Sequence, residues 1–281
     1  MALARIGSSQ FAVLITGAVF FITVPLILSL IWTKKKNERF TTVLVGALTF
    51  LLFVIVLEKP IQNVLLFPTQ MGLSDHAVSR FFDARPFLWA LAAGLFPGIF
   101  EETGRLVAFK TVLKKRRNRE TSISHGIGHG GFEVIYIMGL TYITYIVYAV
   151  MINTGTFQVA VKELEAKLPG QAAQAYAVAQ QLAVISFADL GLGIVERVFA
   201  VMFHLGASIL VFYACRDKGR FWLYPLAILL HSLMDFTVGL NLAGILTISA
   251  WGLEAIIAVF GIATFCGAYF LLYRKDVIVS E

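Results

Sequence analysis

The sequence predicts an all-α, polytopic membrane protein with about seven transmembrane helices. Of its 281 residues, 58% are hydrophobic and only 14% are charged, and the mean hydropathy is +0.81. Soluble globular domains carry about 25% charged residues. Apolar segments long enough to cross the hydrocarbon core, which takes about 20 helical residues, recur along the chain. This composition excludes a soluble enzyme, a disordered chain and a fibrous repeat.

Seven apolar segments have the required length, and together they are expected to form one integral membrane domain over residues 1–281. Two long outer loops separate some of them. In the first loop, the apolar run 61–67 is expected to lie at the membrane interface. In the second, residues 161–168 and 171–183 are expected to form helices on the outer surface. The expected spans are about 10–32, 40–57, 86–113, 121–152, 186–214, 221–238 and 247–273.

Basic residues predict the orientation, because cytoplasmic loops are enriched in Lys and Arg. Fourteen of the 23 Lys and Arg residues follow the first, third, fifth and seventh spans, and only six lie in the other exposed segments. The N-terminus is therefore expected outside and the C-terminus inside a bacterial-type cytoplasmic membrane. The net charge of +6 then reflects solvated inner loops and contacts with the lipid bilayer, not nucleic-acid binding.

Ionisable side chains inside the expected spans need an explanation, because an Asp, Lys or Arg at mid-span costs about 2.5–3.5 kcal/mol on insertion scales. Four helices each bring a carboxylate or an imidazole to one layer, about 12–18 Å from the inner end of the span. Scattered structural residues would not be expected to share a depth. The candidates are Glu101, Glu102 and Arg105 in the third span, His129 and Glu133 in the fourth, His204 in the fifth, and His231 and Asp235 in the sixth.

Spacing within the helices adds to this pattern. An i,i+4 separation puts two side chains on one helix face, so an acidic partner can pair with a cation or fix the tautomer of an imidazole. Pro97-Gly98 precedes the third-span carboxylates and can kink or open that helix. Glycines between residues 126 and 131 allow close helix approach. The i,i+4 pairs are Glu101 with Arg105, His129 with Glu133, and His231 with Asp235.

These motifs, in this order, resemble the YhfC family of intramembrane metalloproteases. That family is similar to a wider superfamily of type II CAAX prenyl endopeptidases, bacteriocin-processing CPBP proteins and PrsW-type site-1 proteases. The resemblance covers residues 86–240 and implies a four-helix catalytic core there. The motifs are Phe100-Glu101-Glu102-Thr103-Gly104-Arg105, Gly128-His129-Gly130-Gly131-Phe132-Glu133, Glu196-Arg197 with His204, and His231-xxx-Asp235.

Three departures from the superfamily pattern point to the YhfC branch. The first motif is E-E-x-x-R and not E-E-x-x-x-R. The residue four before His129 is His125 and not Phe, and the last motif ends in Asp235 and not Asn. These differences weaken the transfer of a prenyl-protein substrate to this chain.

The resemblance implies hydrolysis of a peptide bond of a membrane protein or peptide in the inner half of the bilayer. Glu101 or Glu102 would act as the general base on a water, and the superfamily pattern favours Glu101. His129 would assist, and Arg105 would hold Glu101 ionised. His204 would complete the site.

Two chemistries remain open. In one, His129, His204 and His231, alone or with a glutamate, bind Zn²⁺, which lowers the pKa of a bound water to about 7. In the other, no metal is present and a Glu/His pair activates the water. His231, oriented by Asp235, would bind either the developing oxyanion or the metal.

Other classes of function use the same residue types. Intramembrane carboxylates and histidines also build proton relays, so a proton-coupled transporter is an alternative. A non-catalytic membrane scaffold is another, because a family resemblance does not guarantee chemistry. Transporters commonly carry broken helices in both halves of the chain, whereas only the third span has a Pro-Gly break here.

Reporter fusions test the expected orientation. Fusions after residues 36, 117, 218 and 281 should all report the cytoplasmic side, and fusions near residues 75 and 165 should report the outer side, because the basic loops alternate with the others. A cytoplasmic signal at residue 165 would contradict the seven-span topology.

Overall fold

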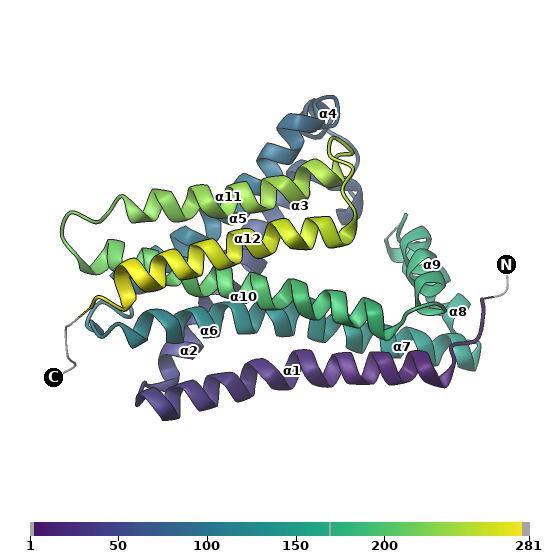
Figure 1. Cartoon of the computed structure of the whole chain (residues 1–281). Helices are drawn as coiled ribbons and strands as arrows, with labels where there is room; N and C mark the ends of the chain where they lie inside the picture. The colour runs from purple at the N-terminus through teal and green to yellow at the C-terminus, as the bar shows by residue number, and fades with distance from the viewer. Residues whose placement is uncertain (1–2, 169, 277–281) are drawn as a thin grey trace.

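The computed structural model describes residues 3–168 and 170–276, and every regular element in these ranges is helical. Long helices lie side by side in a bundle, with the two termini at opposite ends (Figure 1). The polytopic, all-helical class expected from the composition is therefore confirmed. The long elements are α1 (Ser8–Lys36), α2 (Phe40–Phe50), α5 (Pro86–Lys110), α6 (Glu120–Val134), α7 (Leu140–Thr154), α10 (Phe187–Arg216), α11 (Leu223–Leu242) and α12 (Ala250–Ala268).

Six stretches of helix, and not seven, are both long and apolar enough to cross a membrane in the described part of the chain. The expected span 86–113 corresponds to α5, whose 25 residues are about 37 Å long, enough for a crossing. Its Glu101, Glu102 and Arg105 reduce its apolar character, and all three are buried by neighbouring helices. The six are Ser8–Lys36, Phe40–Leu66, Glu120–Thr154, Phe187–Arg216, Leu223–Leu242 and Ala250–Tyr273.

The second span is longer than the sequence predicted. From α2 the helix continues through a π-helical segment, η1 (Leu51–Glu58), directly into α3 (Lys59–Leu66). The expected end at residue 57 is therefore wrong, and the run expected over 61–67 continues the same helix as far as Leu66. Pro60 lies at the junction where the π-helical segment changes to the α-helix.

The remaining elements are short. The two helices expected in the second long loop are present as α8 (Phe157–Lys167) and α9 (Gln171–Leu182). A second π-helical segment, η3 (Ile135–Gly139), joins α6 to α7, and a third, η4 (Tyr269–Tyr273), ends α12. The 3-10 turn η2 (Pro68–Met71) and α4 (Ala77–Asp83) connect α3 to α5.

Glycine allows α2 and α6 to pack backbone against backbone. A Cβ atom at Gly128 of α6 would collide with the carbonyl oxygen of Val43, and one at Gly46 of α2 would collide with the carbonyl oxygen of His125. The obstacles are backbone atoms, so a side chain at either position cannot be accommodated by a rotamer change. Small residues at helix contacts serve this purpose in membrane proteins.

The arrangement of the helices positions the polar residues. Helix α5 packs most extensively on α11, while α6 packs on both α2 and α10. The four helices that carry the candidate residues are therefore neighbours in the centre of the bundle. The two π-helical segments η1 and η3 lie in the helices next to this centre, and such segments are frequent at functional sites.

Because α2 and α6 pack so closely, a single methyl group added at their contact is expected to destabilise the protein. Gly128→Ala should lower the unfolding free energy by about 1–3 kcal/mol, the usual cost of overpacking. The measurement is thermal unfolding of the purified protein in detergent. Gly267→Ala in α12 is the matched control, because a Cβ there meets nothing within 4 Å. An equal effect of both substitutions would contradict the packing argument.

Candidate active site

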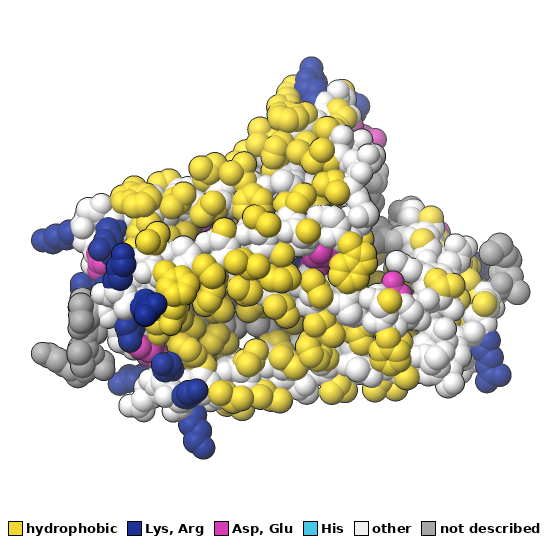
Figure 2. Space-filling view, viewed as in Figure 1, with side chains coloured by type: hydrophobic (Ala, Val, Ile, Leu, Met, Phe, Trp, Pro, Cys, Tyr) yellow, Lys and Arg dark blue, Asp and Glu magenta, His cyan; other side chains and the backbone are white. Residues whose placement is uncertain are grey.

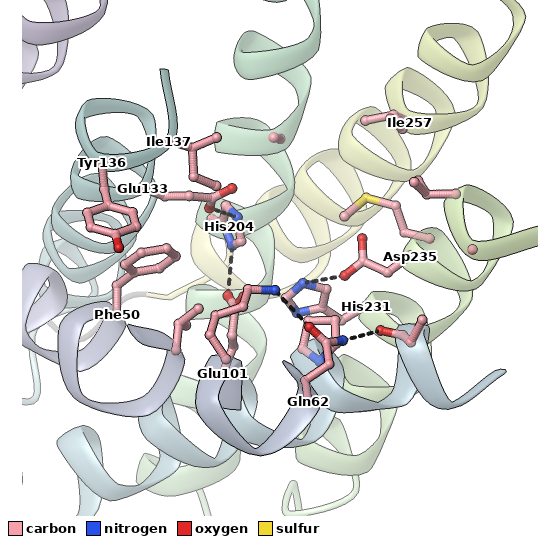
Figure 3. Close-up of a pocket in the computed structure, with 18 of the residues that line it drawn as sticks. Phe50, Gln62, Glu101, Glu133, Tyr136, Ile137, His204, His231, Asp235 and Ile257 are labelled. Atoms are coloured by element: carbon pink, nitrogen blue, oxygen red, sulfur yellow. Dashed lines mark hydrogen bonds and ion pairs between the residues drawn. The ribbon is translucent and has the colours of Figure 1, made fainter. Parts of the chain in front are cut away.

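All eight residues singled out from the sequence lie around one region between α5, α6, α10 and α11. A cavity of about 450 Å³ opens there, within the size range of small-ligand sites. Glu101, Glu133, His204, His231 and Asp235 line it, as the close-up in Figure 3 shows. The other three, Glu102, Arg105 and His129, are fully buried in the wall behind.

Glu101 is the meeting point of two histidines. Its Oε2 lies 2.8 Å from Nε2 of His129 and 3.8 Å from Nδ1 of His204. The three side chains come from α5, α6 and α10, and one donor atom from each lies within 4.8 Å of the others. Each of the three is at most 5% exposed.

Arg105 pairs differently from the prediction. Its Nη1 lies 2.6 Å from Glu102 Oε1, whereas its closest approach to Glu101 is 3.7 Å. The expected i,i+4 pair is therefore the weaker contact, and the i,i+3 pair with Glu102 is the direct one. The difference arises because Arg105 also reaches across to α10, where its Nη2 lies 2.7 Å from His204 Nδ1.

The contacts of His204 fix its tautomer. A guanidinium has only donors, so His204 Nδ1 must accept the hydrogen bond from Arg105. The proton of the neutral ring is then on Nε2, which contacts Glu133 Oε2. Glu133 therefore pairs with His204 and with Arg197, whose Nη1 lies 2.8 Å from Oε1, and not with His129 as its spacing predicted. Arg197 also contacts its sequence neighbour Glu196.

His231 is held by Glu102 more closely than by Asp235. Its Nδ1 lies 2.8 Å from Glu102 Oε1, while its Nε2 lies 3.5 Å from Asp235 Oδ2, beyond an ordinary hydrogen bond. Glu102, which had no expected partner, therefore orients both Arg105 and His231. Asp235 remains the more exposed carboxylate, with a side chain 28% accessible toward the cavity.

Sequence analysis missed three polar residues of the second span, two of which line the cavity. Lys59 Nζ lies 3.0 Å from Glu58 and 3.1 Å from Gln62 Oε1, and both Lys59 and Gln62 line the cavity. Glu58 is completely buried. The only signal in the sequence is a charged pair after an apolar run, a pattern that is typical of the start of a loop.

His125 is also fully buried, one helix turn from His129. Its Nε2 lies 3.3 Å from the Thr49 hydroxyl and its Nδ1 lies 3.4 Å from the Ser208 hydroxyl. Because the same Ser208 hydroxyl accepts from Arg105 Nε, His125 supports the buried network and does not face the cavity.

The residues present fit a metal ion. Two imidazoles and one carboxylate are the donor set of one type of catalytic zinc site, and three protein ligands leave a position for water. His129 Nδ1 is buried without a hydrogen-bond partner among the described residues, so this ring has an unused lone pair or N–H. The expected third ligand, His231, lies outside this cluster, and its Nδ1 contacts Glu102; Glu101 takes that place.

Comparisons with known proteins agree with these features. The model of the YhfC intramembrane metalloprotease family matches residues 20–258. The chain is 32% identical over 246 residues to the uncharacterised membrane protein YhfC of Bacillus subtilis strain 168. The aligned region covers 87% of this chain and 89% of that protein. No solved structure matches.

The buried contacts of Arg105 predict its effect on stability. Arg105→Met should lower the unfolding free energy by about 3–5 kcal/mol, because it leaves the Glu102 carboxylate buried without its cation. The double variant Glu102→Gln/Arg105→Met should recover part of this loss. Chemical denaturation in mixed micelles measures both.

Arg220 provides the control for this experiment. The Arg220 side chain pairs with Asp217 and is 45% exposed, so Arg220→Met should lower the unfolding free energy by only about 0–1 kcal/mol. A loss for Arg105→Met no larger than the control would contradict the assignment of a buried network.

Proposed function

Because the chain belongs to the YhfC intramembrane metalloprotease family, we propose that it hydrolyses peptide bonds of membrane proteins or peptides at the cavity between α5, α6, α10 and α11. The observation that carries the proposal is the buried cluster of Glu101, His129 and His204. The cluster lies at a cavity with apolar walls that include Phe50, Val238 and Ile257, as an apolar substrate segment requires.

Glu101, His129 and His204 would hold the metal, and the donor set favours zinc. A bound Zn²⁺ would supply a water of pKa about 7 and polarise the peptide carbonyl. In the zinc mechanism Glu101 is therefore proposed as a metal ligand. In a mechanism without metal, Glu101 would instead be the general base of a Glu/His pair.

The proton acceptor in the zinc case is proposed to be His231 together with Asp235. Glu102 accepts the Nδ1 proton of His231, so that in the neutral ring Nε2 carries the lone pair. Nε2 and Asp235 Oδ2 are two acceptors 3.5 Å apart at the cavity, a separation at which one water can donate to either. A histidine oriented by a buried carboxylate is a common arrangement for a general base.

Other residues act by holding these groups in position. Arg105 keeps His204 in one tautomer, and Glu133 accepts its Nε2 proton. Lys59 brings an ammonium group to the cavity wall, where it would attract the carbonyl oxygen of a substrate as negative charge develops on it.

We also infer that the N-terminus lies outside and the C-terminus inside a cytoplasmic membrane, with residues 1–281 as one membrane domain. Lys and Arg side chains concentrate at the end of the bundle where the chain terminates (Figure 2). Hydrogen bonds from Arg116 to Thr41 and from Arg117 to the carbonyl of Arg216 tie three basic segments together at this end. Their co-location supports the orientation inferred from the loop charges.

Zinc content and cleavage, measured on the same preparations, test the proposal. Wild-type protein should contain about one zinc per chain and cleave members of a membrane-peptide library. Glu101→Gln and His129→Ala should lose both zinc and cleavage, because each removes a ligand. His231→Gln should keep zinc but lower the cleavage rate at least about 100-fold, the usual effect of losing an acid–base group.

His76→Gln is the matched control, because His76 lies outside the buried cluster and caps α4. It should keep both zinc and cleavage. Cleavage by metal-free protein, lost in Glu101→Gln, would assign Glu101 as the base in place of a ligand. Unchanged cleavage in both Glu101→Gln and His231→Gln would overturn hydrolysis at this site.

A further inference from the structure

A second, small cavity lies between the end of α5, the turn that follows it and the end of α10. Its volume is about 80 Å³, several times the roughly 10–15 Å³ that one water needs. Five of the eight residues that line it are basic and none is acidic. They are Lys110, Lys114, Arg116, Arg117 and Arg216.

Most of this positive charge is not neutralised by the protein. Arg216 forms ion pairs with Asp217 and Asp276. The other four cations have no carboxylate within 4.0 Å in the described ranges of the chain. Arg116 donates to the Thr41 hydroxyl and Arg117 to a backbone carbonyl, both of which are neutral. Like charges gathered in this way favour an anion as the ligand.

The frame of the cavity is held in a defined arrangement. Arg117 donates to the carbonyl of Arg216, and Arg216 donates to the carbonyl of Arg117. The rings of Phe109 and Phe212, which also line the cavity, pack edge to face with their centroids 5.4 Å apart. The turn after α5 and the end of α10 are therefore joined by two reciprocal hydrogen bonds, and a pair of packed aromatic rings adds to this contact.

The surroundings indicate the level of the membrane at which the cavity lies. Val112, Phe221 and Trp222 are 69%, 53% and 60% exposed, and Lys110 Nζ lies over the ring of Phe221. Aromatic side chains of this kind concentrate at the boundary between hydrocarbon and headgroups. An apolar surface for an acyl chain thus adjoins a cluster of cations for a headgroup.

We propose that this cavity binds the phosphate of an anionic phospholipid headgroup. Arginine pairs with phosphate through parallel N–H donors, and the lysines add point charges. Basic pockets between membrane helices bind such headgroups through the same chemistry. The exposed apolar side chains next to Lys110 favour a lipid over a free phosphate ion.

Binding at this position would brace the helices of the candidate active site. Lys110 lies nine residues after Glu101 on α5, and Arg216 lies twelve residues after His204 on α10, distances of about 14 Å and 18 Å along the helices. A headgroup that joins the two helix ends would hold α5 and α10 together. The lipid should therefore raise the thermal stability of the protein.

Titration with phosphatidylglycerol labelled on an acyl chain tests the proposal in detergent-solubilised, full-length protein. Unlabelled phosphatidylglycerol should displace the label, phosphatidylcholine should do so poorly, and millimolar inorganic phosphate should not. Lys110→Gln/Lys114→Gln should weaken binding about tenfold, because two of the unpaired cations are lost. Both lysines are exposed, so the variant should fold.

The matched control is Lys34→Gln/Lys35→Gln, which removes the same charge from the same end of the bundle but outside the cavity. It should change the affinity less than about twofold. The single variant Lys114→Gln should give an intermediate effect. Equal losses in the two double variants would mean nonspecific attraction and would overturn the site. Displacement of the label by inorganic phosphate as effective as by phosphatidylglycerol would overturn the lipid assignment.

Discussion

The burial of the Arg105 guanidinium is the constraint on which the centre of this structure depends. A charged group inside a membrane protein is stable only when partners satisfy it, and Arg105 is completely buried. Its donors reach Glu102 on its own helix and both His204 and Ser208 on α10. The helices α5 and α10 must therefore pack at one register and one rotation. Glu102 extends the same constraint to α11 through His231.

The apolar helices pack closely around the polar centre, so that, in the part of the chain that the structure describes, it is accessible only through the cavity. The glycines at the α2–α6 contact bring these two helices together next to His125 and His129. Beyond that contact both helices change to π-helical form, in η1 and η3, and residues of both segments line the cavity. The wider turn of a π-helix alters the direction in which side chains point, so the cavity follows from the local helix geometry as much as from the polar residues.

Hydropathy and helix geometry made the architecture predictable, because a long apolar run has one stable form in lipid. The eight candidate residues were also identifiable, since ionisable groups at a shared depth are improbable as filler. Their pairing was not predictable. Spacing within a helix favoured Arg105 with Glu101 and His129 with Glu133, whereas contacts between helices joined Arg105 to His204 and His204 to Glu133. Lys59 was missed because the continuation of α2 through η1 into α3 depends on packing that no local pattern encodes.

The hydrogen bonds of His204 set a condition on metal binding. Nδ1 of this ring accepts from Arg105 and Nε2 faces Glu133, so neither nitrogen is free in the structure. A metal ion held by Nδ1 would compete with the guanidinium for one lone pair. Arg105 retains Glu102 as a partner after such an exchange, so its charge would remain compensated. The pair of Glu102 and Arg105 can therefore stabilise the four-helix core in the absence of an ion and also let His204 turn from a hydrogen-bond acceptor into a ligand. In the proposed function the two adjacent glutamates would therefore have different roles: Glu101 would contribute to the donor cluster, and Glu102 would keep the displaced cation in place.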